Sequence, residues 1–394
     1  FLTQTTAMEK RKIAILGSTG SIGIQALDVV REHRDLFDVQ LLTAGSNSSL
    51  LIRQAIEFDA ACAIIADESL YDEVYEALNP HGINVFAGMS SIIDAMSTSD
   101  NIDMVLSAMV GFRGLEPTLA ALRSGKAVAI ANKEPLVAAG KIVMQTAREH
   151  NAPVLPVDSE HSAIFQALQG EHSPIERIFL TASGGPFLRT PASELAQVTV
   201  AEATNHPRWK MGRKITVDSS TLMNKGFEMI EACWLFGVDI SQITVVIHPQ
   251  SVIHSMVSFQ DGAVMAQMST PDMRLPIQYA LTYPARMPLD IPRLDFYKLG
   301  GFTFSEPDTA KFPCLGFAVE AMRKGGNMPC IMNAANEVAV DAFLNERIRF
   351  TDIPAVISRC MEKCSFVKDP DLDGILETDR LTREFASNLI AKNK

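Results

Sequence analysis

The chain has 394 residues, of which 47% are apolar and 21% are charged, and this composition excludes a disordered or fibrous protein. Its 35 basic and 46 acidic residues give a formal charge of −11, so nucleic-acid binding is not expected, because such a surface repels phosphate backbones. The length predicts two or three domains.

The chain shows no signal for a membrane or for an oxidising compartment. Its apolar runs are all shorter than the roughly 18 residues that a membrane span needs. The first twelve residues lack the apolar core of a signal peptide, and Met8 is a candidate for the natural first residue. The six cysteines are scattered without a CxxC pair, which is typical of reduced thiols. We therefore expect a cytoplasmic protein without a membrane partner.

Residues 1–158 alternate short β-branched runs with amphipathic stretches, a pattern that predicts a Rossmann-like parallel sheet with helices on both faces. Helices are expected at residues 22–31 and 49–58 and between most of the later strands. The strands are expected at residues 12–16, 39–44, 63–66, 84–87, 104–107, 128–130 and 154–157.

The pattern changes after residue 158, and the expected fold is α/β with two further parts. Residues 159–281 predict a central α+β catalytic domain, with strands at 243–248, 252–259 and 263–268, and Asp261-Gly262 marks a hairpin. Four prolines mark residues 282–308 as a linker. Residues 309–394 predict a C-terminal four-helix bundle, with helices at 314–323, 328–345, 352–363 and 378–392.

A glycine-rich turn, Gly17-Ser-Thr-Gly-Ser-Ile-Gly23, follows the first strand and opens the first helix. Glycines allow a close approach to a pyrophosphate, and the helix N-terminus offers free N–H groups, so the turn predicts dinucleotide binding. An ordinary strand–helix turn is the alternative. The second strand ends in Gly45-Ser46-Asn47 without the carboxylate that usually binds the ribose of NAD, which favours NADP. Turn chemistry alone could also explain these three residues.

A second motif, Asp158-Ser159-Glu160, follows an apolar strand. In extended backbone the two carboxylates point the same way, and they repel unless a cation lies between them. Oxygen ligands suit Mg²⁺ or Mn²⁺. Glu228 and Glu231 lie three residues apart on one helix face, and either could supply the third ligand. A helix cap is the alternative interpretation of the first two acids.

Hydroxyl, amide and ammonium groups that together could hold a phosphate occur at Ser183, Ser219, Asn224 and Lys225, although each alone is more typical of a cap or a surface residue. The segment His206-Pro-Arg-Trp209-Lys-Met-Gly212 predicts either a lid or a loop anchored by a buried tryptophan. His248 and His254 lack zinc-ligand spacing, so each is expected to be a hydrogen-bonded core histidine.

Taken together, these motifs resemble the 1-deoxy-D-xylulose 5-phosphate reductoisomerase family over nearly the whole chain. The matching segments are GSTGSIG (17–23), ANKE (131–134), LPVDSEH (155–161), SGGPF (183–187), HPRWKMGRK (206–214), VDSSTLMNKG (217–226), IHPQSVIHS (247–255) and NAANE (333–337). The resemblance implies an NADPH- and divalent-metal-dependent enzyme that rearranges this phosphosugar and reduces the product to 2-C-methyl-D-erythritol 4-phosphate, in non-mevalonate isoprenoid synthesis. Family members are homodimers. Either a retro-aldol/aldol route or a single ketol shift fits these residues.

The resemblance also assigns roles to residues, and it selects Glu228 over Glu231. The implied metal ligands, which act in catalysis with Lys133, are Asp158, Glu160 and Glu228. The implied substrate contacts, which also include Glu160 and Glu228, are Lys133, Ser159, Ser183, His206, Trp209, Ser219, Asn224, Lys225 and His254. The implied NADPH contacts are Thr19, Gly20, Ser21, Ile22, Gly45, Ser46, Asn47, Asn132, Glu134 and Gly212.

This chain departs from the family pattern at Ser46, where some members carry a basic residue, and at Pro135, where serine or threonine is more usual. Two other functions remain as alternatives. Another NADP-dependent dehydrogenase, for example one acting on semialdehydes, would turn over NADPH despite chelation. A nucleotide-sensing protein would bind NADPH without turnover.

Overall fold

The computed structural model describes residues 9–209 and 211–392. The candidate start Met8, most of the segment tested for a signal peptide, and Lys210 of the HPRWKMGRK motif lie outside the described residues. The chain forms two compact units built from interleaved segments. Unit 1 comprises the residues up to Asn132, Gln145–Asp158 and Met273–Asp290, and unit 2 comprises Lys133–Met144, Ser159–Asp272 and the residues from Ile291 onward.

Unit 1 is built on a parallel sheet with the strand order β4-β3-β2-β1-β5-β6-β7, seven strands within the described residues. The central strands are buried, and Ile13–Leu16 of β1 are fully inaccessible, which explains their continuous apolar runs. The order reverses beside β1, between β2 and β5, where open α/β sheets bind ligands. The strands are β1 (Arg11–Leu16), β2 (Phe37–Ala44), β3 (Cys62–Ile65), β4 (Asn84–Ala87), β5 (Met104–Ser107), β6 (Ala127–Ile130) and β7 (Val154–Pro156).

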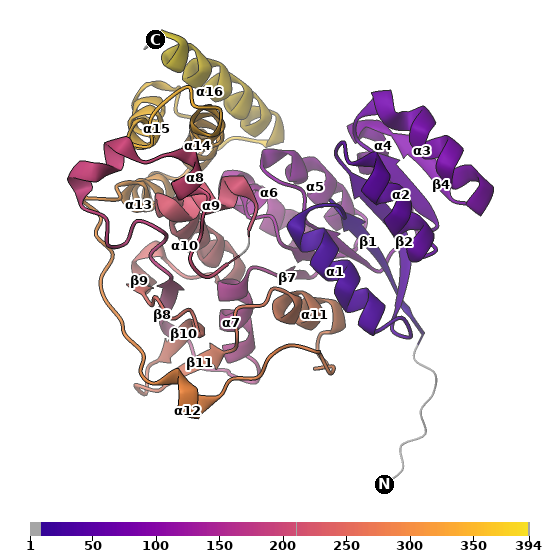
Figure 1. Ribbon diagram of the computed structural model, residues 1–394, viewed down its shortest axis with the longest axis horizontal. Coiled ribbons are helices and arrows are strands. Elements are labelled where there is room, and N and C mark those ends of the chain that lie inside the picture. Colours follow the sequence, from indigo (N-terminus) through magenta and orange to yellow (C-terminus); the bar gives the residue numbers. More distant parts are fainter. Residues whose placement is uncertain (1–8, 210, 393–394) are drawn as a thin grey trace. The chain divides into compact units, whose positions relative to one another are not determined.

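Helices pack beside this sheet, and Figure 1 labels α1, α2, α3, α4, α5 and α11 in unit 1. They are α1 (Ser21–Glu32), α2 (Ser48–Glu57), α3 (Tyr71–Leu78), α4 (Gly88–Thr98), α5 (Leu115–Arg123) and, from much later in the chain, α11 (Arg274–Thr282). Helix α11 packs on α1, and the carbonyl of Pro288 lies 2.8 Å from His33 Nε2. Helix α6 (Glu134–Glu149) begins in unit 2 and ends in unit 1.

Unit 2 contains a mixed sheet with the order β11-β10-β8-β9, four strands in the described part of the chain. Its strands are β8 (Ile175–Ala182), β9 (Ile243–Ile247), β10 (Ile253–Phe259) and β11 (Val264–Met268). The predicted Asp261-Gly262 hairpin is confirmed, because β10 and β11 pair antiparallel across it. Strand β8 lies inside the sheet, antiparallel to β10 and parallel to β9, and the sequence analysis did not predict it.

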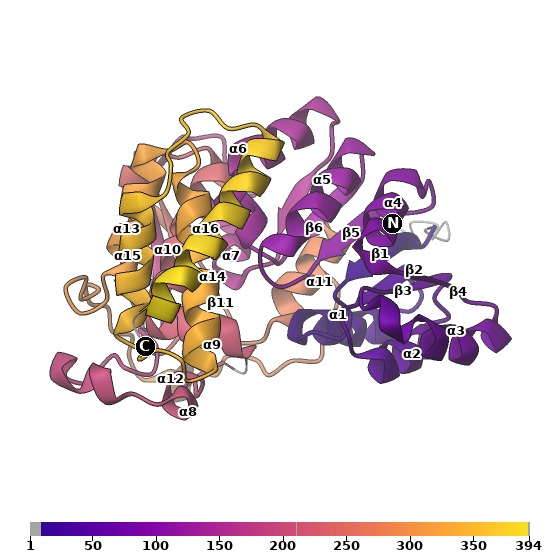
Figure 2. The same ribbon diagram turned by 90° about the horizontal axis from the view of Figure 1, so that it is seen from above.

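The helices of unit 2 pack on one another mainly through the buried helices α10 and α14. They are α7 (Ser159–Ala167), α8 (Val200–Ala203), α9 (Arg213–Ser220), α10 (Met223–Phe236), α12 (Phe296–Leu299), α13 (Cys314–Lys324), α14 (Met328–Leu344), α15 (Asp352–Lys363) and α16 (Leu372–Lys392). Helix α10 packs on α13, and α7 packs on β10. Figure 2 shows α13, α14, α15 and α16 side by side, as predicted for the C-terminal bundle.

The α/β fold class predicted from the sequence is confirmed. The segment expected to be a linker contains α12 and a bridge between Ser305 and Ile247 of β9. The four-part domain division stays a prediction. Among the described residues, no helix combines the length and the apolar character that crossing a membrane would require.

Candidate functional site

The glycine-rich turn of unit 1 joins β1 to α1 where the strand order reverses. A Cβ at Gly23 would lie 2.3 Å from the carbonyl oxygen of Gly17, so this close approach requires glycine. Gly20 is the residue before α1, and no side chain in the described residues caps this helix end. The backbone N–H groups at the start of α1, which include those of Ser21 and Ile22 and lie next to Thr19, can therefore bind an anion such as a pyrophosphate.

The other cofactor-contact residues predicted in unit 1 follow neighbouring strands. Gly45, Ser46 and Asn47 are exposed after β2, and Asn47 Oδ1 accepts the Leu50 N–H at 3.2 Å to cap α2. Asn132 follows β6, and its buried amide donates to the carbonyl of Gly111 at 3.0 Å. The carboxyl ends of β1, β2 and β6 therefore carry these predicted contacts, as in other nucleotide-binding parallel sheets.

The predicted metal ligands meet at the start of α7 and in α10. Potential ligand oxygens of Asp158, Glu160 and Glu228 all lie within 4.8 Å of one another. Asp158 is joined by one peptide bond to Ser159, the first residue of α7, and Ser159 Oγ donates to Glu160 Oε2 at 2.7 Å. Glu228 lies in α10 and is 1% exposed. Three carboxylates at this separation are the hard oxygen donors that suit Mg²⁺ or Mn²⁺.

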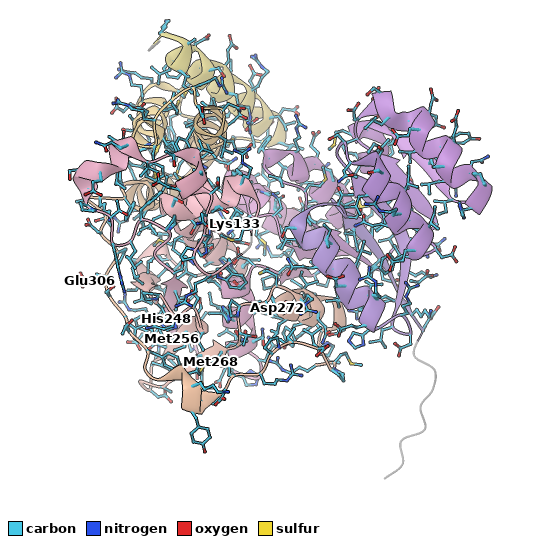
Figure 3. All side chains as sticks on the ribbon, viewed as in Figure 1. Lys133, His248, Met256, Met268, Asp272 and Glu306 are labelled. Carbon is cyan, nitrogen blue, oxygen red and sulfur yellow. The ribbon has the colours of Figure 1, made fainter. Side chains whose placement is uncertain are left out.

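Two ammonium groups form ion pairs with two of these acids, Glu160 and Glu228. Lys225 Nζ forms ion pairs with Glu228 and, at 3.2 Å, with Glu160. Lys133 Nζ, labelled in Figure 3, lies 3.1 Å from Glu228 Oε1 and donates to Asn224 Oδ1 at 2.8 Å. Both lysines are 5% exposed. Buried ammonium groups beside buried carboxylates are typical of a site for anionic groups and cations rather than of a solvated surface.

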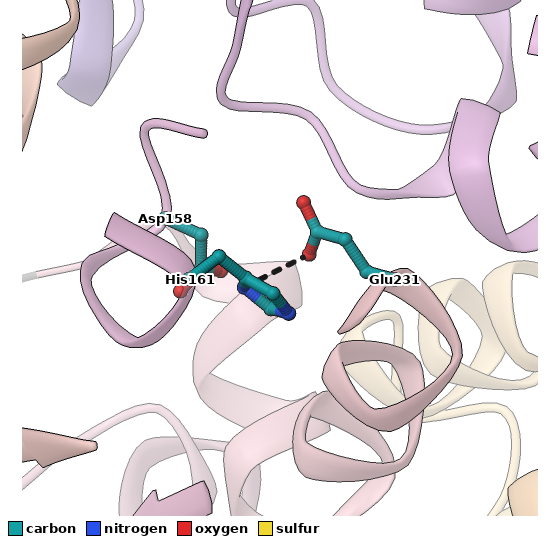
Figure 4. A group of neighbouring side chains, drawn as sticks. All are labelled: Asp158, His161 and Glu231. Carbon is teal, nitrogen blue, oxygen red and sulfur yellow. Dashed lines mark ion pairs between the residues drawn. The ribbon is translucent and has the colours of Figure 1, made fainter. Parts of the chain in front are cut away.

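The two acids left open as the third metal ligand have different surroundings. Glu228 gathers with Glu160, whereas Glu231 faces His161, whose Nδ1 lies 3.4 Å from Glu231 Oε2. Figure 4 shows this second group, in which Asp158 also takes part. His161 is the last residue of the LPVDSEH motif, but it was not predicted as a site residue. In the sequence, a role for this histidine was indicated only by its position next to Glu160 and four residues after an expected strand.

A group of phosphate donors is built around Ser183. His206 Nδ1 lies 2.9 Å from the Trp209 N–H and 3.2 Å from the Arg208 N–H, so Nδ1 is an acceptor. The proton of the neutral imidazole is then on Nε2, which donates to Ser183 Oγ at 3.0 Å. The Gly185 N–H donates to the same oxygen at 3.2 Å. Ser183 therefore accepts two hydrogen bonds and retains its own O–H as a donor.

Burial lowers the pKa of His206 to about 4, in agreement with this neutral form. The Ser183 loop lies against Ser219 of α9, because a Cβ at Gly185 would be 2.8 Å from the Ser219 carbonyl oxygen. Asn224 and Lys225 lie in the first turn of α10. These are the donors predicted for a phosphate.

The loop between α8 and α9 carries the remaining predicted substrate contacts. Trp209 is half-buried, and its ring packs edge-on against His254 with the ring centroids 6.0 Å apart. His254 is buried in β10, and this burial lowers its pKa to about 4. Gly212, a predicted cofactor contact, is exposed and immediately precedes α9. As expected, His248 is a hydrogen-bonded core histidine, because its Nε2 accepts two backbone N–H groups and its Nδ1 faces the Thr303 carbonyl.

Glu134, the last predicted cofactor contact, belongs to a buried ion cluster that sequence reasoning missed. Its Oε1 lies 2.6 Å from Lys214 Nζ, which also pairs with Asp218 at 2.8 Å. Burial raises the pKa of Asp218. Burial acts in the same direction on Glu134 and is the largest single effect there, but the charge and hydrogen bond of Lys214, a backbone hydrogen bond and the charge of Lys133 together outweigh it, so the pKa of Glu134 is lowered. Asn336, in the NAANE motif, donates to Asp218 Oδ1 at 2.8 Å.

A dinucleotide-type parallel sheet in unit 1, together with a carboxylate cluster and phosphate donors that belong, apart from Asp158, to unit 2, is the combination expected of a nucleotide-dependent oxidoreductase that uses a divalent cation. Three family profiles match the chain: 1-deoxy-D-xylulose 5-phosphate reductoisomerase (residues 13–140), its C-terminal domain (residues 154–236) and the DXP reductoisomerase C-terminal domain (residues 268–385). The 1-deoxy-D-xylulose 5-phosphate reductoisomerase of Bacteroides fragilis is 53% identical over 98% of this chain and 99% of its own, and that of Porphyromonas gingivalis is 52% identical over 97% and 99%.

Solved structures agree with these sequence relatives. The Zymomonas mobilis reductoisomerase in complex with NADPH matches with a TM-score of 0.90 and 42% identity, over 97% of this chain and 99% of that one. A DOX-P reductoisomerase in complex with NADPH, fosmidomycin and magnesium matches with a TM-score of 0.92 and 40% identity, over 97% and 98%. The chain belongs to the 1-deoxy-D-xylulose 5-phosphate reductoisomerase family. The predicted family, enzyme class, function and cofactors are confirmed, and the roles of single residues stay predictions.

Proposed function

We propose that this chain converts 1-deoxy-D-xylulose 5-phosphate to 2-C-methyl-D-erythritol 4-phosphate with the residues described above. The reaction rearranges the carbon skeleton and then reduces the resulting aldehyde. A divalent cation, when bound, supplies positive charge to the substrate oxygens, and NADPH, when bound, supplies the hydride. Asp158, Glu160 and Glu228 would hold the cation. The observation that carries this proposal is the gathering of these three carboxylates, with oxygens within 4.8 Å, beside two buried lysines.

The phosphate of the substrate would be held by the donors around Ser183. The Ser183 hydroxyl oxygen accepts hydrogen bonds from two N–H groups and keeps its own O–H to donate, and Ser219 lies against the same loop. Asn224 and Lys225 add an amide and an ammonium at the start of α10. Holding the phosphate away from the reacting carbons orients them, because remote binding energy offsets the entropy of alignment.

Lys133 is placed to act on the reacting part of the substrate. Its ammonium lies between Asn224 and Glu228, so it sits between the phosphate donors and the carboxylates. There it would stabilise negative charge that develops on the substrate oxygens. Trp209, on the loop before α9, would cover the substrate and exclude water while the aldehyde exists.

NADPH would bind along the glycine-rich turn and the segment after β2. The amides around Thr19–Ile22 would receive the pyrophosphate, and Gly45, Ser46 and Asn47 would accommodate the 2′-phosphate, because these three residues carry no carboxylate to repel it. Asn132, Glu134 and Gly212 complete the proposed contacts.

A second copy of this chain is the partner that we propose for the sheet of unit 2. Strand β11, which ends at Met268 in Figure 3, pairs only with β10 within the described residues. Its Val264 and Met265 are 50% and 46% exposed. An edge strand with exposed apolar side chains is a template for pairing with another strand, which supports a homodimer built across this edge.

The test of the activity is NADPH oxidation with 1-deoxy-D-xylulose 5-phosphate and Mg²⁺ or Mn²⁺, before and after EDTA. EDTA should abolish turnover, and added Mn²⁺ should restore it. Glu160→Gln should lower kcat by about a hundredfold or more, because the cation contributes several kcal/mol of charge stabilisation. The dissociation constant for NADPH should stay within a few-fold.

The exposed carboxylate of Glu171 in the same unit offers a matched control. Glu171→Gln should leave both turnover and NADPH affinity unchanged. Turnover that survives EDTA would contradict the metal-dependent reaction. Full activity of Glu160→Gln would contradict the assignment of this residue to the cation.

A further inference from the structure

Histidine 161 joins the two helices that carry the proposed metal ligands. It follows Glu160 in α7, and its side chain is fully buried. Its Nε2 lies 2.8 Å from the backbone carbonyl oxygen of Glu228 in α10. Its Nδ1 lies 3.4 Å from Oε2 of Glu231, one turn further along the same helix. One imidazole therefore contacts α10 at two successive turns.

The tautomer of this histidine follows from its partners. A carbonyl oxygen can only accept, so Nε2 of His161 carries a proton and donates it to Glu228. Nδ1 faces the Glu231 carboxylate, which is 1% exposed, and because an unprotonated Nδ1 and a carboxylate are both acceptors, a hydrogen bond between them requires a second proton, on Nδ1 or on the carboxyl group. The Phe236 ring stacks on the imidazole with an interplanar angle of 7° and fixes its plane. These three contacts with α10 hold the imidazole in one orientation.

We propose that the His161–Glu231 pair is a positioning device for the metal ligands, a role that rests on the proposed function of Glu160 and Glu228. The contact at the Glu228 carbonyl fixes the backbone from which that carboxylate projects. The covalent neighbour of His161 is Glu160, so the same contact fixes the second carboxylate. Glu231 holds the imidazole in register and is not itself a ligand.

The proposal explains why two acids one turn apart on α10 have different surroundings. Glu228 makes contacts with Lys133, Lys225 and Asn224, all of which belong to the proposed site. Glu231 is paired with His161 instead. Groups that orient metal ligands commonly change metal affinity by about 10- to 100-fold when they are removed.

The test is Mn²⁺ binding to the substrate-free protein, measured by electron paramagnetic resonance at one pH. His161→Leu should raise the Mn²⁺ dissociation constant by about tenfold or more. His161→Gln should restore most of the affinity, because its amide N–H can reach the Glu228 carbonyl. Glu231→Gln, which keeps the size but removes the charge and replaces one acceptor oxygen by an NH2 donor, should raise the constant by a few-fold and covers the case in which His161→Leu does not fold.

His248 supplies a matched control, because it is equally buried in the same unit and also contacts backbone groups. His248→Leu should lower the melting temperature without changing Mn²⁺ affinity. The proposal is overturned if His161→Leu behaves in the same way. It is also overturned if Glu231→Gln removes a second bound Mn²⁺, because the pair would then itself be a cation site. Unchanged Mn²⁺ affinity in Glu160→Gln would instead refute the proposed function of the carboxylates.

Discussion

The contact between the Ser183 loop and α9 allows a sharp test of the phosphate site. Gly185 has φ of +68°, and an added Cβ would lie 2.8 Å from the Ser219 carbonyl oxygen, whereas ordinary contact begins near 3.4 Å. Gly185→Ala must therefore move the loop and α9 apart by roughly 0.6 Å, the difference between these two distances. Misplacement of binding groups by about 1 Å can cost about a hundredfold, so we expect kcat/KM for 1-deoxy-D-xylulose 5-phosphate to fall about tenfold.

Gly184 offers a matched control one residue away. Its φ is +87°, so alanine there carries a similar backbone penalty of about 1–2 kcal/mol. The atoms nearest to its added Cβ would belong to the flexible side chain of Leu188, at 2.9 Å, and not to the backbone. Steady-state kinetics of both variants should show a loss within about threefold for Gly184→Ala, with KM for NADPH unchanged in each. Equal losses in the two variants would mean that the Ser219 contact does not position the phosphate site.

Three further predictions concern pH, stability and assembly. Burial lowers the pKa of His206 in the folded state from 6.5 to about 4, so the neutral histidine stabilises the folded protein fully above pH 6.5, and this stability is lost as the pH falls toward 4. The melting temperature of His206→Asn should therefore depend less on pH across this range than that of the unchanged protein. An equal dependence on pH would contradict the burial argument. Lys214→Met should lower the free energy of unfolding, measured by urea titration, by about 3 kcal/mol or more, because it leaves the buried acids Glu134 and Asp218 without the ammonium group that pairs with them. Lys214→Arg keeps the positive charge and should lose much less stability. Equal losses in the two variants would refute the charge argument. Met265→Lys should raise the dissociation constant of the dimer, measured by sedimentation, at least about tenfold. Phe86→Lys, at an exposed position of unit 1, should leave this constant unchanged. A dimer unaffected by Met265→Lys would exclude the β11 edge as the interface.

Local patterns in the sequence determined much of this protein. The continuous apolar run Ile13–Leu16 of β1 reflects burial on both faces of a parallel sheet, so this strand was predictable. The Asp261-Gly262 hairpin was predictable because its turn chemistry is contained in two residues. The close approach at Gly23 was predictable because glycine spacing marks where backbones meet. These features need only neighbours along the chain.

Pairing across long sequence separations was decided by the tertiary structure alone. Strand β8 was not predicted, because the strands beside it lie more than 60 residues later and its own sequence contains charged residues at its exposed start. The two acids of α10 could not be distinguished from their spacing, since both lie on one helix face. The packing of α7 on α10 decides that Glu231 contacts His161, whereas Glu228 pairs with Lys133 and Lys225. Likewise, Lys214 pairs with Glu134, which lies 80 residues earlier in the sequence. A buried carboxylate is stable only beside a positive charge, and any part of the chain can supply that charge.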